Sequence, residues 1–196
     1  MSKRGKRHYL LLYARQFARQ RAPTFLIGVL CAGLWWFANL IPALSSDLAQ
    51  YALIAGAAAG GLFFLYSLIA PRLSYVQCYP QYLCVSAPFF RVVMSYSRIR
   101  NVRPVKFAPR KLKDSQRSLV EPFLGQTILG LDLHTYPLSE RWLRFGLHRF
   151  MFSEDFTGLL FHVRDWMSLS SEIDSFRSLR KGTRVDTPSI NPFSYH

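Results

Sequence analysis

Histidine is the residue type in this sequence that most readily suggests chemistry, because imidazole binds metal ions and transfers protons near neutral pH. His134 and His148 fall in segments that we predict to be strands, and His162 falls in a predicted helix. No cysteine or carboxylate stands at ligand spacing beside any of the three. We therefore interpret them as surface histidines, and we predict neither a metal site nor a cofactor.

The sequence contains no recognisable motif for nucleophilic catalysis. Serine, histidine and aspartate are present, but no nucleophile-elbow sequence exposes a serine, and the glycines of residues 56–61 lie inside an apolar run. Cys31, Cys78 and Cys84 cannot all pair, which fits a reducing compartment. Cys78 and Cys84 can approach each other across a predicted hairpin, although we interpret each as a buried thiol. We predict no catalytic residues.

A cluster of basic side chains is the feature that most suggests binding in a chain of formal net charge +14. It consists of Arg98, Arg100, Arg103, Lys106, Arg110, Lys111, Lys113 and Arg117, against the single acid Asp114. Anionic lipid, an acidic face of a membrane complex and nucleic acid are the possible partners. Nucleic acid is unlikely because no recognition helix or stacking motif accompanies the charge. We predict contact with lipid or protein.

Two uncharged apolar runs, residues 24–44 and 48–70, must position these groups. Each reaches roughly 30 Å as a helix, which is the thickness of the hydrocarbon core of a bilayer. Only Ser45, Ser46 and Asp47 separate them, so a transmembrane helical hairpin is predicted. The alternative, a hairpin buried in a soluble core, fits two adjacent runs of full bilayer length poorly.

Charge asymmetry predicts the orientation of this hairpin. Seven Lys or Arg residues precede Thr24, and Arg72 follows the second run, whereas the short connection carries no basic residue. The positive-inside rule then places both termini in the cytoplasm and the short connection outside. The basic segment 1–23 is either an amphipathic helix on the headgroups or a solvated tail.

Small residues recur at four-residue spacing in both apolar runs. Gly28 and Ala32 form such a pair in the first run, and Gly56 and Gly60 form one in the second. This spacing allows helix backbones to approach closely. We predict packing within the hairpin, with association of two copies as the alternative.

The pattern changes to period-two alternation after Pro71. Strands are predicted at residues 73–78, 82–86, 91–96, 99–107, 127–134, 142–148 and 149–152. Residues 108–122 form a basic loop too polar to bury. A helix is predicted from Ser153, with an apolar stripe of Phe156, Leu159, Leu160, Val163 and Met167. Residues 169–196 read as a flexible tail.

Seven strands followed by a helix, together with residues 75–85 (YVQCYPQYLCV) and the step Tyr-Ser-x-Ile-x-x-Val at 96–102, resemble the bacterial pleckstrin-homology-like (PH-like) domains found after paired membrane spans. The resemblance implies an α+β membrane protein in which residues 72–168 form a β-barrel capped by a C-terminal helix. That family has no catalytic signature. The uncharged turn Tyr79-Pro80-Gln81 argues against specific phosphoinositide recognition.

We therefore predict a non-catalytic, membrane-anchored adaptor, either an accessory subunit or an assembly factor of a bacterial membrane complex. Its partners would be membrane lipid and other membrane-protein subunits, with homo-oligomers possible. The alternative is a membrane-bound enzyme or sensor whose site is too scattered to recognise in one sequence.

Overall fold

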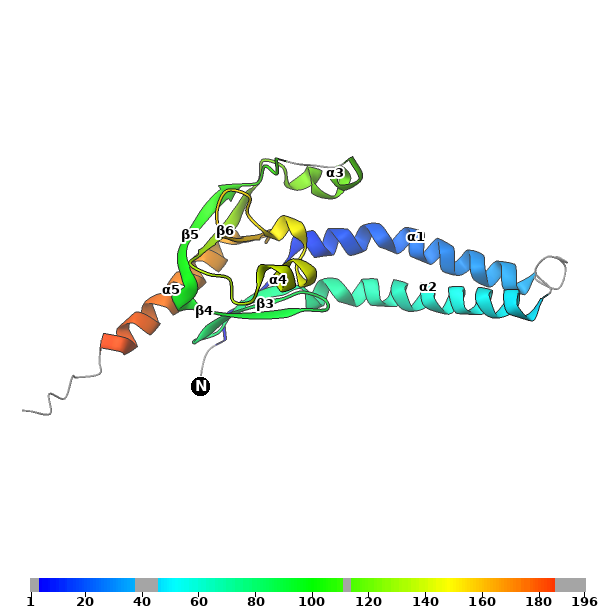
Figure 1. Cartoon of the computed structure of the whole chain (residues 1–196), viewed down its shortest axis with the longest axis horizontal. Coiled ribbons are helices and arrows are strands. Elements are labelled where there is room, and N and C mark those ends of the chain that lie inside the picture. The colour runs from blue at the N-terminus through cyan, green and yellow to red at the C-terminus, as the bar shows by residue number, and fades with distance from the viewer. Residues whose placement is uncertain (1–3, 38–45, 111–113, 186–196) are drawn as a thin grey trace, which may run out of the picture.

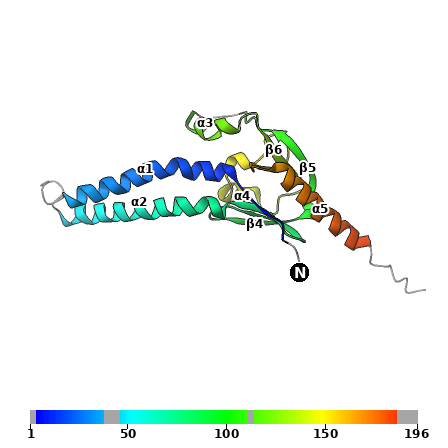
Figure 2. The same cartoon turned by 180° about the vertical axis from the view of Figure 1, so that it is seen from behind.

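The computed structural model describes residues 4–37, 46–110 and 114–185 (Figure 1). Within these residues the chain is an α+β protein with five α-helices and two antiparallel sheets. Two long helices lie side by side and extend away from a globular part that contains both sheets (Figures 1 and 2). The described chain begins and ends on the globular side of the long helices.

The first sheet has the order β1-β2-β3-β4, with strands Arg7–Tyr9, Tyr75–Cys78, Tyr82–Ser86 and Arg91–Ser95. The last three of these strands were predicted, and β4 shows the expected alternation: Val92 and Met94 are buried, whereas Arg91 and Val93 are exposed. Strands β2 and β3 instead have consecutive buried residues. Strand β1 is unexpected. Both long helices separate β1 from β2 in the sequence, yet the two strands pair, with Tyr9 opposite Tyr75.

The second sheet has the order β5-β6-β7, with strands Ile99–Lys106, Thr127–Leu133 and Gly158–Phe161. A 3₁₀ turn at Tyr96–Arg98 separates β4 from β5. The predicted closed barrel is wrong: the described strands form two sheets, connected by the isolated bridge between Leu10 and Val163. The chain leaves the first sheet at the 3₁₀ turn, and two of the segments expected as strands are not strands.

The strands predicted at residues 142–148 and 149–152 are helix α4, Glu140–Gly146, and a 3₁₀ turn, Arg149–Met151. The apolar residues of this segment fit both the two-residue period of a strand and the 3.6-residue period of a helix. Leu143 and Leu147 are four apart and both buried, whereas Phe145, which alternation would place beside them, is exposed. The helical period therefore describes this segment.

The helix predicted from Ser153 begins later, because residues 158–161 are the buried strand β7. A continuous apolar strand is buried on both faces and shows no alternation, so its period is ambiguous. Helix α5, Trp166–Val185, covers residues that we expected in a flexible tail, and it buries Leu169 and Ile173. Residues 186–196 lie outside the described residues.

The predicted basic loop 108–122 also contains structure. Helix α3, Asp114–Val120, is followed by a 3₁₀ turn, Glu121–Phe123. Leu119, Val120 and Phe123 are buried in the core, which corrects the expectation that this segment is too polar to bury.

The two long helices are α1, Leu11–Trp36, and α2, Asp47–Leu73. The start of α1 belongs to the globular part, because Leu12, Tyr13 and Phe17 are buried in the core. Residues 7–22 are therefore not a solvated tail. They form strand β1 and the first turns of α1, which pack into the core.

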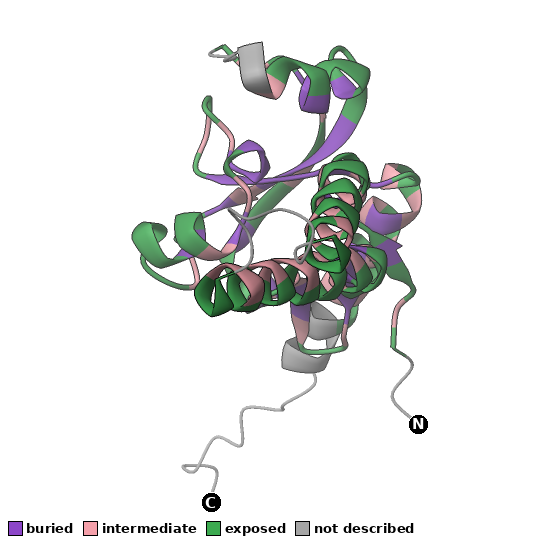
Figure 3. Cartoon of the chain, turned by 90° about the vertical axis from the view of Figure 1, so that its right-hand side faces the viewer, coloured by how far each residue is buried: buried purple, intermediate pink, exposed green. Residues whose placement is uncertain are grey.

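Large apolar side chains on the rest of both long helices are exposed. The end-on view in Figure 3 shows these helices mainly in the colours of exposed and intermediate residues. The exposed large apolar side chains on α1 and α2 are Phe25, Leu26, Ile27, Val29, Leu30, Leu34, Trp35, Trp36, Leu48, Tyr51, Ile54, Leu62, Phe63, Leu65, Leu68 and Ile69. In the described part of the chain one helix, α2, is long and apolar enough to cross a membrane. Residues 38–44 of the first apolar run lie outside the described residues.

We predict that a fragment beginning at residue 72 does not fold alone. It lacks β1 and the buried side chains of Leu10, Leu12, Tyr13 and Phe17. At about 2 kcal/mol for each buried side chain, the loss is about 8 kcal/mol, comparable with the whole stability of a typical domain. Circular dichroism should report an unstructured fragment 72–185, and a peptide of residues 4–22 should restore strand and helix signal. A fragment that folds without the peptide would contradict the prediction.

Candidate functional site

The basic cluster follows one edge of the second sheet. Arg98 ends the 3₁₀ turn before β5, and Arg100, Arg103 and Lys106 are exposed on β5, which pairs only with β6 among the described strands. Arg110 follows β5, and Arg117 is exposed on α3. Lys111 and Lys113 lie outside the described residues.

Contacts with the rest of the chain hold several of these residues in place. Arg98 donates to the carbonyl of Tyr136 at 2.9 Å, and the Arg103 guanidinium lies 4.2 Å from the centre of the Phe156 ring. Arg110 forms an exposed ion pair with Asp155, which contributes little to stability in high dielectric. These contacts leave the guanidinium of Arg103 fixed and solvent-accessible on the surface of the sheet.

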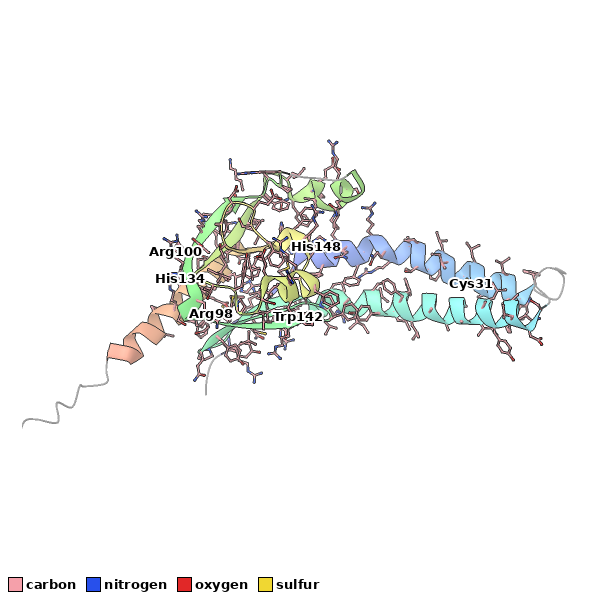
Figure 4. All side chains as sticks on the ribbon, in the orientation of Figure 1. Cys31, Arg98, Arg100, His134, Trp142 and His148 are labelled. Carbon is pink, nitrogen blue, oxygen red and sulfur yellow. The ribbon has the colours of Figure 1, made fainter. Side chains whose placement is uncertain are left out.

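The fold divides the cluster instead of presenting it as one patch. Arg98 and Arg100 lie on the side of the globular part that is away from the long helices (Figure 4). Arg117, in contrast, is on α3, where Ser118 accepts hydrogen bonds from Arg15 and Arg19 of α1. Basic side chains that are close in sequence therefore face two different surroundings.

The four small residues predicted to pack the hairpin lie along α1 and α2. A Cβ at Gly60 would lie 2.9 Å from the Cα of Gly28, and a Cβ at Gly56 would lie 3.0 Å from Sγ of Cys31. Gly28, Ala32 and Gly60 also line an apolar groove between the two helices. The backbones of α1 and α2 therefore approach each other closely at Gly28 and Gly60.

The three histidines differ in environment. His134 is exposed, as we predicted, and His148 is half-buried. His162 is buried, so its interpretation as a surface residue is wrong. Burial lowers the pKa of His148 to about 4, with a further contribution from the charge of Arg149. Burial also lowers the pKa of His162 to about 4, and His148 adds to the shift. Both rings are neutral near pH 7.

His162 is enclosed by aromatic rings. The centres of Phe107 and Phe123 lie 4.4 and 5.3 Å from the imidazole, both at steep angles. Neither ring nitrogen of His162 has a hydrogen-bond partner among the described residues. A buried polar ring without partners destabilises the fold relative to an apolar side chain of similar size.

We predict that His162→Leu makes the fold less sensitive to acid. The folded pKa of His162 lies below the unfolded value, so the unfolded chain takes up a proton first and the stability of the parent falls as the pH drops from about 6.5 toward about 4. Relative to the parent, the variant should gain about 2 kcal/mol more unfolding free energy at about pH 5 than at about pH 7.5. Denaturant titrations at both pH values measure this. Exposed His134→Leu is the control, and equal gains at both pH values would contradict the prediction.

The cysteines are all free thiols. Burial raises the pKa of Cys78 to about 12, so this thiol is protonated and unreactive. Cys84 accepts a hydrogen bond from Nε of Arg91 at 3.0 Å. Because Cys78 is paired with Leu83, the neighbour of Cys84, the two thiols point to opposite faces of the sheet. In the part of the chain that the structure describes, no three His, Cys, Asp or Glu side chains are grouped to hold a metal ion.

Sequence reasoning missed a group of exposed aromatic side chains, Phe89, Trp142 and Phe145, near the base of the long helices. Phe89 stacks on Tyr66 of α2, with 5.1 Å between ring centres. The sequence signal was weak: Phe89 follows Pro88 in the turn between β3 and β4, where an apolar side chain has no core to enter. Trp142 and Phe145 were assigned to a strand.

A scan against protein-family models finds no match, and searches among curated proteins and among solved structures find none either.

Proposed function

We propose that this chain is a non-catalytic adaptor that α1 and α2 anchor in a membrane. The observation that carries the proposal is the exposed apolar surface of both helices, which project from a globular part with its own core. Each such side chain contributes about 1.5–3 kcal/mol when it leaves water. Apolar surface of this extent on a soluble protein would cause aggregation, whereas acyl chains solvate it.

The second helix of the proposed anchor is α1. Its described portion carries Arg15, Arg19 and Arg21, which lower its mean hydropathy, but the run from Thr24 onward is uncharged. Arg21 donates to the carbonyl of Ser67 on α2 at 3.2 Å, so the basic residues of α1 lie at the globular end of the helical pair. That position suits arginines at the headgroups on the cytoplasmic side.

The globular part is the adaptor module. The order of a four-stranded sheet, a three-stranded sheet and a C-terminal helix supports a PH-like relationship, although the strands do not close into a barrel. Arg98 and Arg100, on the side away from the long helices, are suited to an acidic face of a protein partner. Arg117, beside α1, is suited to anionic headgroups.

Cysteine labelling in intact cells tests the anchoring. In a chain with Cys31, Cys78 and Cys84 replaced by alanine, an impermeant maleimide should label Ser46→Cys from outside the cell. It should label Ser2→Cys and Ser189→Cys only after the membrane is permeabilised. Release of the chain from membranes by alkaline carbonate would contradict a membrane-spanning hairpin.

Purification of the full chain in mild detergent tests the adaptor role. We expect a stoichiometric partner protein, which Arg98→Glu combined with Arg100→Glu should remove. Arg117→Glu is the matched control because it reverses one charge on the other side of the fold, and the partner should remain. A chain that elutes alone and turns over a substrate would support the enzyme alternative instead.

A further inference from the structure

Three large aromatic side chains without a role in the core lie on segments near the base of the helical pair. Phe89, Trp142 and Phe145 are 82%, 65% and 87% exposed, and they come from two separate segments of the chain. Exposed aromatics of this size are uncommon on a soluble surface, and a group of them indicates an interaction site.

Phe89 is positioned by the turn between β3 and β4 and by α2. The backbone N–H of Ala87 donates to the carbonyl of Phe90 at 2.7 Å, which closes the turn. The Phe89 ring then stacks on Tyr66, whose ring also contacts Phe17 and Phe63. Phe89 therefore continues the apolar surface of α2 onto the globular part.

Helix α4 is held beside the same turn. Gly146 approaches the Phe90 ring so closely that a Cβ at position 146 would lie 2.2 Å from it. On the other side, the Tyr13 hydroxyl accepts a hydrogen bond from the backbone N–H of His148 at 2.9 Å, which ties the end of this segment to α1. Helix α4 and the residues that follow it are therefore held between the turn that carries Phe89 and the first turn of α1.

The exposed face of α4 is amphipathic. Leu143 faces the core, whereas Trp142 and Phe145, three residues apart on the helix, are exposed, and Arg141 is exposed beside them. Arg144 is on another face, where it pairs with Glu140. A tryptophan and a phenylalanine beside an arginine are the side chains that favour the boundary between headgroups and acyl chains.

We infer that Phe89, Trp142 and Phe145 form an interfacial anchor, which inserts into the headgroup region of the bilayer that α1 and α2 span. The inference rests on the proposed membrane anchoring. A bilayer is the occupant because Phe89 continues the apolar surface of α2, and Trp142 lies near the base of the helices in Figure 4. The anchor fixes the globular part so that Arg98 and Arg100 face away from the membrane.

Single-tryptophan variants of the full chain in nanodiscs test the inference. The chain has four tryptophans, Trp35, Trp36, Trp142 and Trp166, and each variant keeps one while the others become phenylalanine. The nanodiscs contain anionic lipid brominated either close to the headgroup or close to the chain end. We expect shallow bromine to quench Trp142 more strongly than deep bromine, and we expect neither to quench Trp166 on α5.

Trp36 lies on α1 inside the apolar region, so its quenching tests the membrane anchoring independently of the interfacial anchor. If bromine in neither position quenches Trp36, the proposed membrane anchoring fails. If Trp36 is quenched and Trp142 is not, the interfacial anchor alone is overturned. In the variant that keeps Trp142, adding Phe89→Ser and Phe145→Ser should reduce the quenching of Trp142. Unchanged quenching in that variant would show that these residues do not form one anchor.

Discussion

Alanine at position 158 is expected to disrupt the second sheet and to lower the unfolding free energy by about 3 kcal/mol or more. Gly158 is the first residue of β7 and is paired with Asp132. A Cβ at this position would lie 2.1 Å from the carbonyl oxygen of Leu131 and 2.6 Å from the Phe156 ring. The oxygen belongs to the backbone of the central strand β6, so no rotation of a side chain relieves the overlap.

The same geometry explains why glycines occupy diagonal positions on β6 and β7, where Gly130 pairs with Leu160 and Gly158 pairs with Asp132. A Cβ at Gly130 would lie 3.1 Å from the Phe156 ring, so the ring covers both glycines. Arg103 in turn stacks on Phe156. The missing side chains at positions 130 and 158 therefore make room for an aromatic ring that carries an arginine of the basic cluster.

Thermal unfolding of the full chain in detergent, followed by near-ultraviolet circular dichroism, measures the effect of Gly158→Ala. Gly125→Ala is the control, because Gly125 has open space around its Cα but a φ of +73°. That control should lose only about 1 kcal/mol from backbone conformation. Equal losses in the two variants would mean that contact with β6 is not responsible.

Local patterns predicted the strands of the first sheet that follow the long helices. Strand β3 has its predicted bounds, because turn residues stand on both sides of it in the sequence. The predictions for the segments that form helix α4 and strand β7 were wrong because their apolar residues have no unique period. In α4, apolar residues spaced by two and by four fit both a strand and a helix. In β7, which is buried on both faces, every residue is apolar or glycine and no period is visible.

Long-range pairing was outside the reach of pattern reasoning. Strand β1 has only three residues, and its pairing with β2 is visible only once α1 and α2 bring Arg7 next to Gln77. The N-terminal segment therefore read as a separate basic element, although its side chains complete the core. Strands β1 and β2 pair in space, but the two helices separate them in the sequence. Such a pairing leaves no signal in the local sequence pattern.

The candidate site was predicted only in part, because its arrangement also depends on contacts between segments that are distant in the sequence. Sequence clustering identified the basic residues but not their division between the two sides of the globular part, since an eight-residue strand carries Arg100 and Lys106 well apart. The aromatic patch escaped notice because its members come from the turn after β3 and from α4. Their proximity depends on the contact between Phe90 and Gly146.

Alanine at position 60 is expected to push α1 and α2 apart, whereas alanine at position 61 is expected to leave the pair intact. A Cβ at Gly60 would lie 2.9 Å from Cα and 3.1 Å from N of Gly28, and both are backbone atoms. A Cβ at Gly61 would meet nothing within 4 Å. Overpacking of this kind destabilises by about 1–3 kcal/mol, while Gly61→Ala gains up to about 1 kcal/mol of helix propensity.

A disulfide between the helices measures their separation. The 3.0 Å between Sγ of Cys31 and an ideal Cβ at position 56 makes Gly56→Cys a reporter when Cys78 and Cys84 are replaced by alanine. Under mild oxidation, thiol counting with a maleimide polymer should show rapid loss of both thiols in this background. Adding Gly60→Ala should slow that loss, and adding Gly61→Ala should not. Equal rates in both variants would place the close contact of α1 and α2 elsewhere than at Gly28 and Gly60.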